Sequence, residues 1–192
     1  MIEPRQDVSF ADFVAWERDQ AELHELIAGR IVRFLAGSAD DEIMTVNVLA
    51  KLHASVAPPC IVFPSTTIVQ TASRIGRDGY RPDVTVACSK ANVGRREFIE
   101  EPRVVVEILS PSNYGHDWNA KLFEYWNTAS IEQLVLIDAQ ARHVTSNVRD
   151  ADGTWLPPLI HRNDGVLDFT PLAVSMTFEK IYANTSLAAE RR

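Results

Sequence analysis

The stretch Arg103-Val-Val-Val-Glu-Ile-Leu109 decides the fold, because it is the most apolar run in this chain of 192 residues. Its β-branched residues are typical of a strand that is buried on both faces. Apolar side chains then recur at helical spacing over residues 116–129, and a second apolar run follows at residues 134–138. A strand, a helix and a strand in this order predict two parallel strands joined by a crossover.

Pairs of shorter β-rich runs flank this unit and predict antiparallel hairpins. One pair lies within residues 23–35, around Ala28-Gly29, and the other lies at residues 143–149 and 154–160, around a turn at residues 150–153. The length fits one domain, which we assign to residues 1–192. We therefore predict an α/β fold with a mixed central β-sheet, flanking helices and antiparallel hairpin extensions.

The other segments are predicted from spacing and from turn residues. Ser9 and Asp12 form a capping pattern that predicts a helix to about Gln20. A helix is predicted over residues 41–57, with an apolar face of Ile43, Val46, Leu49, Ala50 and Leu52. We also expect β-rich segments at residues 60–69 and 82–88, a polar loop at residues 73–81 and a short helix at residues 177–182.

Composition narrows the class of protein. Hydrophobic residues make up 46% of the chain and charged residues 23%, which is ordinary for a globular domain and excludes a disordered or collagen-like chain. The net charge of −7 excludes a domain that binds nucleic acid by bulk positive charge. The N-terminus lacks the apolar core of a signal peptide, and no stretch approaches a membrane span. We expect a soluble cytoplasmic protein.

Two cysteines, Cys60 and Cys88, stand 28 positions apart, without a C-x-x-C or metal-ligand spacing. In a reducing compartment this pattern favours two free thiols over a disulfide or a nucleophile, which are the minor alternatives. We therefore expect Cys60 and Cys88 to be free.

Ionisable residues in apolar or strand-end positions suggest a chemical site. Glu107 lies within the apolar run, where burial of a carboxylate is costly unless a cation compensates it. Asp83 follows a proline at the start of a strand, and Glu25 interrupts an apolar strand. Carboxylates from adjacent strands can bind Mg²⁺. The alternatives are a strand-end Glu107 paired with an arginine, and a capping or solvated Asp83.

A polar stripe runs along the helix that follows the apolar strand. Asp117, Lys121 and Tyr125 recur every four residues, beside the apolar side chains Trp118 and Leu122. This spacing is typical of an ion pair on a solvated face. Because the apolar face lies so close, the stripe can instead border the core and face the strand ends.

In these residues the chain resembles the Uma family of bacterial restriction endonucleases, within the PD-(D/E)XK nuclease superfamily. The resemblance covers about residues 8–183 and implies a restriction-endonuclease-like fold. Its marks are Glu25-Leu-Ile-Ala-Gly-Arg-Ile31, Phe63-Pro-Ser65, Arg81-Pro-Asp-Val84, Glu101-Pro102, Val106-Glu-Ile-Leu-Ser-Pro-Ser112, the spaced Asp117, Lys121 and Tyr125, and Val135-Leu-Ile-Asp138.

The resemblance implies an endonuclease that hydrolyses DNA with Mg²⁺ or Mn²⁺ and acts as a homodimer. Asp83 and Glu107 would bind the metal, helped by the carbonyl of Ile108. The usual lysine position holds Leu109, so Lys121 on the next helix is the candidate for that role. Glu25 would complete the site. The expected substrate contacts are Arg81, Ser110, Asp117 and Tyr125.

Two alternatives remain open at this point. Leu109 at the lysine position allows a non-catalytic domain that binds DNA or another partner and retains the nuclease fold. The basic side chains within residues 74–96 either attract phosphate toward Asp83 or form a solvated loop. A serine hydrolase using Ser110 or Ser112 is disfavoured, because neither serine lies in a G-x-S-x-G turn.

Overall fold

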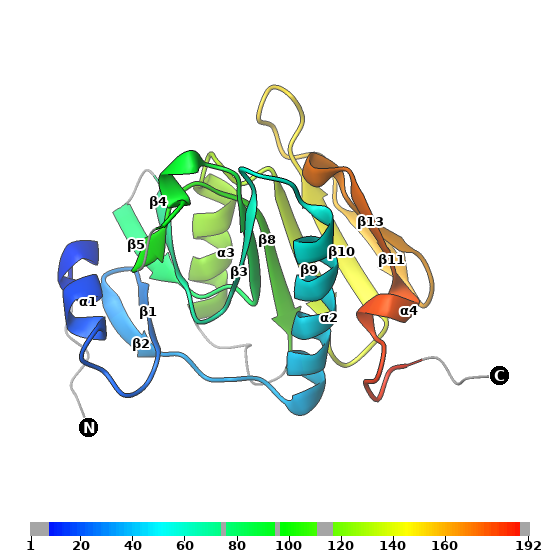
Figure 1. The fold of residues 1–192 in the computed structure, drawn as a ribbon, viewed down its shortest axis with the longest axis horizontal. Helices are drawn as coiled ribbons and strands as arrows, with labels where there is room; N and C mark the ends of the chain where they lie inside the picture. Colours follow the sequence, from blue (N-terminus) through cyan, green and yellow to red (C-terminus); the bar gives the residue numbers. More distant parts are fainter. Residues whose placement is uncertain (1–7, 74–75, 95–96, 111–116, 189–192) are drawn as a thin grey trace.

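The apolar run at residues 103–109 is the centre of a six-stranded sheet. A computed structural model describes residues 8–73, 76–94, 97–110 and 117–188. In it, β8 (Pro102–Leu109) pairs in parallel with β9 (Gln133–Asp138), and α3 (Asp117–Asn127) lies between them in the chain. This confirms the predicted parallel pair with a helical connection (Figure 1). The strand order is β11-β10-β9-β8-β6-β3, with β3 at Ile61–Pro64, β6 at Val84–Ala87, β10 at His143–Val148 and β11 at Leu159–Arg162.

A five-stranded sheet carries the predicted N-terminal hairpin. Strands β1 (His24–Ile27) and β2 (Arg30–Arg33) are joined by Ala28 and Gly29, whose φ angles of 49° and 73° suit a tight hairpin turn. The predicted polar loop at residues 73–81 is wrong, because β5 (Gly76–Tyr80) pairs with β4 (Ile68–Ser73) over five residue pairs. The strand order is β2-β1-β5-β4-β7, with β4 at Ile68–Ser73, β5 at Gly76–Tyr80 and β7 at Phe98–Ile99.

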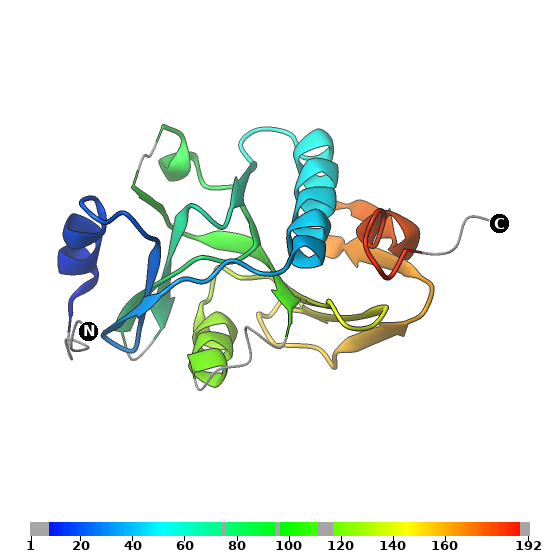
Figure 2. The ribbon, with the colours of Figure 1, turned by 90° about the horizontal axis from the view of Figure 1, so that it is seen from below.

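Helices cover both faces of the six-stranded sheet. Figure 2 shows α2 (Ala39–Ser55) on one side of it and α3 on the other. The predicted apolar face of α2 is partly wrong, since Val46 is 61% exposed while Met44 and Val48 are buried. The remaining elements are α1 (Phe10–Glu17), η1 (Lys90–Asn92), β12 (Val166–Phe169), η2 (Thr170–Leu172), β13 (Val174–Thr177) and α4 (Phe178–Ile181).

The core is divided by the sheet, as strand alternation requires. Val104, Val106 and Ile108 pack in the cluster under α2, whereas Val105 packs with Tyr125 on the α3 side. Glu107 shares the parity of Val105 along β8. Its side chain therefore belongs to the face that α3 covers.

Cys60 and Cys88 form a disulfide, so the prediction of two free thiols is wrong. Strands β3 and β6 are antiparallel, with Ile61 opposite Ala87, which makes the two cysteines neighbours at the ends of these strands. Sequence spacing does not reveal this pairing, because it depends on which strands are adjacent.

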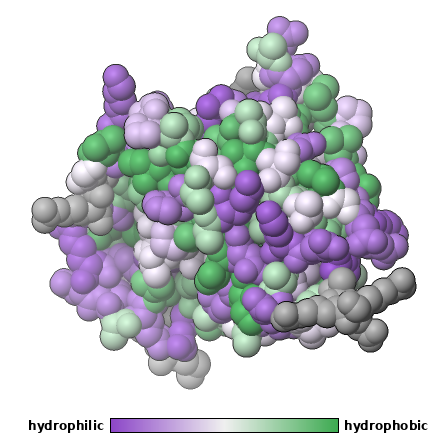
Figure 3. All heavy atoms as spheres, turned by 45° about the vertical axis from the view of Figure 1, so that its right-hand side comes forward, coloured by the Kyte–Doolittle hydropathy of each residue, from purple (hydrophilic) through white to green (hydrophobic). Residues whose placement is uncertain are grey.

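None of the helices in the described part of the chain is both long enough and apolar enough to span a membrane. On the face seen in Figure 3, hydrophobic residues occur in separate groups between hydrophilic ones. The exposed large apolar side chains in the described C-terminal half are Phe123, Trp126, Leu156, Leu159, Ile160 and Val166. Scattered exposure of this kind is normal for a globular domain.

Candidate functional site

Asp83 and Glu107 lie where the pairing of β6 with β8 ends. The last pair of this ladder joins Val84 to Val106, so the strand β6 no longer accompanies β8 beyond that point. There the Asp83 carboxylate accepts a hydrogen bond from the Ile108 amide, with 2.6 Å between Oδ2 and N. The end of the ladder therefore holds the Asp83 side chain beside β8, next to Glu107.

Lys121 joins two of the predicted acidic residues. Its Nζ lies 3.0 Å from Oε1 of Glu25 and 3.0 Å from Oε1 of Glu107, and the residue is only 8% exposed. Tyr125, one turn further along α3, donates its hydroxyl to Oε1 of Glu107 at 2.7 Å. This part of the stripe faces the buried strands and not solvent. The structure thus brings Glu25, Glu107, Lys121 and Tyr125 together.

Burial and like charge set the protonation of the carboxylates. Burial, followed by the charge of Glu107, raises the pKa of Asp83 to about 8, although the Ile108 amide and Lys121 partly oppose this. Burial also raises the pKa of Glu107, against the opposing effects of Lys121 and Tyr125. Burial alone would lower the pKa of Lys121, but the charges of Glu107 and Glu25 outweigh it and hold that pKa above its ordinary value.

A pocket of about 190 Å³ opens onto these groups. Glu25, Asp83, Glu107 and Lys121 all line it. Glu42 also lines it, from the first turn of α2, although nothing in the sequence indicated this residue, because acidic side chains are common in the first turn of any helix. The other lining residues are Ile27, Val32, Arg33, Phe34, Leu35, Gly37, Asp41 and Trp118.

The carboxylate oxygens that line this pocket suit a hard divalent cation, but they do not form a complete coordination shell. Mg²⁺ takes oxygen ligands and commonly uses only one or two carboxylates, with water and substrate completing its shell. Asp83 and Glu107 supply two such carboxylates, and burial is the main reason that their pKa values are raised. Within the described ranges, no three acidic, histidine or cysteine side chains converge on one point.

Arg81 is engaged in a buried network and does not face the pocket. Its Nη2 lies 2.7 Å from Oε1 of Glu17, its Nε donates to the His24 carbonyl at 2.8 Å, and its Nη1 donates to the Thr66 carbonyl at 2.5 Å. Its backbone amide donates to Oε1 of Glu25 at 2.7 Å. At 2% exposure, Arg81 is buried among these partners, and its backbone amide holds the Glu25 carboxylate in place.

The other expected substrate contacts are placed less directly. Ser110 is buried just after β8, at 4% exposure. The side chain of Asp117 lies outside the described residues. Of the basic side chains in residues 74–96, Lys90 is exposed, while those of Arg74, Arg77, Arg95 and Arg96 also lie outside what the structure describes.

Comparisons of the whole chain with known proteins show which proteins it resembles in fold and in sequence. The solved structure of a "putative nuclease belonging to DUF820" from Anabaena variabilis superposes with a TM-score of 0.71 at 15% identity, covering 92% of this chain and 98% of that one. Two uncharacterized proteins of Synechocystis sp. are similar in sequence. The protein slr1290 is 26% identical over 182 residues, 93% of each chain, and sll1609 is 23% identical over 163 residues, 83% of this chain and 91% of its own.

The Anabaena structure shows the fold alone at that identity, namely a single α/β domain with mixed sheets and helices. The family follows from a separate match. Residues 10–179 match the family Uma2, described as "Putative restriction endonuclease". Because this match spans most of the chain, the protein belongs to the Uma2 family of restriction endonuclease-like proteins.

Proposed function

We propose that this protein is a Mg²⁺-dependent endonuclease that hydrolyses phosphodiester bonds of DNA. One observation carries the proposal: the partly buried Asp83 and the buried Glu107 lie beside each other, and Lys121 lies 3.0 Å from Glu107. Two neighbouring carboxylates with a lysine suit phosphoryl chemistry, where charge must be neutralised in the transition state. Family membership supports the same class of reaction.

Asp83 and Glu107 are the residues proposed to hold the cation, with the Ile108 carbonyl as a third oxygen. A bound Mg²⁺ or Mn²⁺ would lower the pKa of a water and offset the negative charge of the phosphate. The Ile108 amide holds the Asp83 carboxylate in place for this role. Tyr125 does the same for Glu107 through its 2.7 Å hydrogen bond.

Lys121 is proposed to act as a fixed positive charge and hydrogen-bond donor. Because Glu107 and Glu25 hold its pKa above the ordinary value despite burial, Lys121 stays protonated at neutral pH and cannot serve as the base. It can orient the attacking water or stabilise charge that develops on the phosphate. Glu25 positions the ammonium group from the other side.

Lys121→Ala should lower the rate of DNA cleavage by about 10²- to 10³-fold, the usual effect of removing one preorganised donor from a charged transition state. Lys180→Ala is the matched control, because Lys180 is exposed on α4 and distant from the pocket lining. Cleavage rates of the two variants at saturating Mg²⁺ check this. Equal rates would remove Lys121 from the reaction.

Mg²⁺ affinity should rise with pH up to about 8, because the pKa of Asp83 is raised to about 8 and its proton must leave before the carboxylate can bind a cation. Below that pH, each unit should weaken binding by up to about tenfold, and above it affinity should level off. Titration calorimetry in two buffers of different ionisation enthalpy would count the protons released. Affinity that does not change between about pH 6 and 8 would contradict the assignment.

The alternative is a DNA-binding or interaction domain that has kept the fold, which Leu109 at the usual lysine position allows. Covalently closed circular DNA distinguishes the two, incubated with Mg²⁺, Mn²⁺ or a chelator. We expect nicking with either metal and none with the chelator. Metal-independent DNA binding without any nicking would support the alternative.

We also propose that the protein forms a homodimer and that it is cytoplasmic. A homodimer would place two sites near the two strands of a duplex, and light scattering of the purified protein tests it. Binding to DNA is expected to be weak without metal and to depend modestly on salt, because attraction to phosphate is local to the site. A cytoplasmic location agrees with a DNA substrate.

A further inference from the structure

A second cavity, of about 840 Å³, lies at the end of the six-stranded sheet away from the proposed nuclease site. Strand β6 follows Asp83 at its start and ends next to Cys88, so the two sites lie at its opposite ends. Cys88 lines this cavity, and none of the carboxylates near Lys121 does. The other lining residues are Gln70, Ser89, Glu100, Glu101, Arg103, Thr128, Ala129, Ser130 and Glu132.

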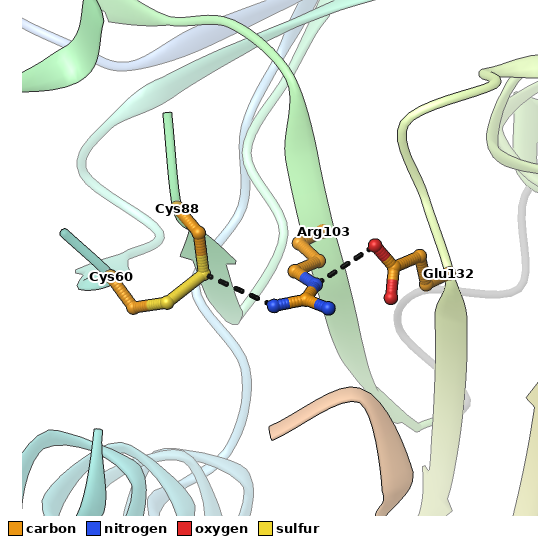
Figure 4. Close-up of a disulfide and its surroundings, with 4 residues drawn as sticks. All are labelled: Cys60, Cys88, Arg103 and Glu132. Carbon is orange, nitrogen blue, oxygen red and sulfur yellow. Dashed lines mark hydrogen bonds and ion pairs between the residues drawn. A yellow bond between two sulfur atoms is a disulfide. The ribbon is translucent and has the colours of Figure 1, made fainter. Parts of the chain in front are cut away.

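The Cys88 sulfur faces a cation in this cavity. Nη1 of Arg103 lies 3.9 Å from Cys88 Sγ, and Nε of the same guanidinium lies 2.9 Å from Oε1 of Glu132, which holds it in place. In Figure 4 the Cys88 sulfur points toward Arg103, and Cys60 lies on the other side of it. Both cysteines are only partly buried. A disulfide sulfur of a cavity-lining residue, next to an arginine, is suited to attack by a thiolate.

We propose that Cys88 is a thiol–disulfide exchange site for a small aminothiol that enters this cavity. The thiolate of the aminothiol attacks Cys88 Sγ and forms a new S–S bond to it. The Cys60–Cys88 bond breaks, and its electron pair leaves on Cys60 Sγ, which takes a proton from water. A second aminothiol then releases the first as its disulfide, so two thiols supply the two electrons and both cysteines end as thiols.

The charges of the cavity select this class of thiol. Arg103 supplies the positive charge that a thiolate needs next to Cys88. Glu100 and Glu101 line the same cavity and would attract an ammonium group. The amide of Gln70, a residue 6% exposed, adds a polar group to the lining. A thiol with a carboxylate in place of the ammonium group would be repelled by the same two glutamates.

The test compares cysteamine with 3-mercaptopropionate, two thiols of similar size and opposite charge. Each reaction rate is divided by the rate of the same thiol with a disulfide of a short reference peptide, which removes differences in thiol reactivity. We expect the protein to favour cysteamine by about tenfold, the lower end of what a local field contributes to association. Alkylation followed by peptide mass spectrometry should find the thiol adduct on Cys88 and the alkyl group on Cys60.

Variants separate the two charges without touching the proposed nuclease site. Glu101→Gln should lower the preference for cysteamine, while Arg103→Met should slow both thiols by about tenfold. Arg18→Met, at the exposed residue that follows α1, is the control and should change neither rate. An adduct on Cys60, equal normalised rates for the two thiols, or two free thiols in the protein as isolated without reductant would each overturn the proposal.

Discussion

Asp83→Asn should abolish DNA cleavage and at the same time make the metal-free protein more stable. The loss of activity, at least about 10³-fold, follows from removal of one of two proposed metal ligands. The gain in stability follows because the folded protein resists ionisation of Asp83, whose pKa is raised to about 8 by burial and by Glu107. Asparagine keeps an oxygen for the Ile108 amide but carries no charge.

The sign of this effect depends on pH in a specific way. An aspartate with a raised pKa destabilises the folded state fully above that pKa, and not at all below its unfolded pKa of about 4. The advantage of Asp83→Asn should therefore be largest above about pH 8, at roughly 2 kcal/mol or more, and should vanish near pH 4.

Urea unfolding of the wild type and the variant across this pH range measures the difference. Asp152→Asn, at an exposed turn residue, is the control and should leave both cleavage and stability unchanged. A variant that is less stable than the wild type above pH 8, or that still cleaves DNA at the wild-type rate, would contradict this account of Asp83.

Arg81→Met should destabilise the protein by about 3–5 kcal/mol, the usual cost of removing one partner of a buried ion pair. The side chains of Arg81 and Glu17 are 3% and 8% exposed, so the buried Glu17 carboxylate would lose its arginine and keep only its contacts with the backbone amide and ring of His24. Arg18→Met is the matched control, because the ion pair of Arg18 with Glu97 is exposed and its loss should change the free energy of unfolding by less than about 1 kcal/mol.

A double-mutant cycle tests whether this destabilisation comes from the pair itself. Removing the charge of Glu17 as well, in Glu17→Gln with Arg81→Met, should cost less than the sum of the two single changes. Equal stability losses for Arg81→Met and Arg18→Met, measured by urea unfolding, would show that the buried network does not support the site.

The sequence predicts those parts of the fold that have strong local patterns. The run at residues 103–109, the following helix and the run at residues 134–138 predict the parallel pair correctly, because each has an unbroken apolar face. Strand β5 is not predicted, because Gly76-Arg-Asp-Gly-Tyr80 has the composition of a loop. The segment is a strand because it pairs with β4. Strand pairing at that position is a property of the sheet and not of the segment.

The candidate site was predictable for a similar reason. Glu107 and Lys121 are ionisable residues beside apolar stretches, which is unusual enough to notice in a single sequence, and the structure places them 3.0 Å apart. Contacts between residues from distant segments leave no comparable pattern in the sequence. Glu17 binds Arg81 from a residue 64 positions earlier, and Cys60 meets Cys88 only because β3 and β6 are neighbours.

The rate of plasmid nicking as a function of Mg²⁺ concentration, for the wild type and Glu107→Gln in parallel, tests the central claim most directly. The claim is that Asp83 and Glu107 hold the cation used to cleave DNA. We expect the wild type to nick supercoiled plasmid at a rate that saturates with Mg²⁺, and Glu107→Gln to be slower by at least about 10³-fold at every concentration. Equal nicking by the two proteins, or nicking that persists with a chelator in place of Mg²⁺, would contradict it.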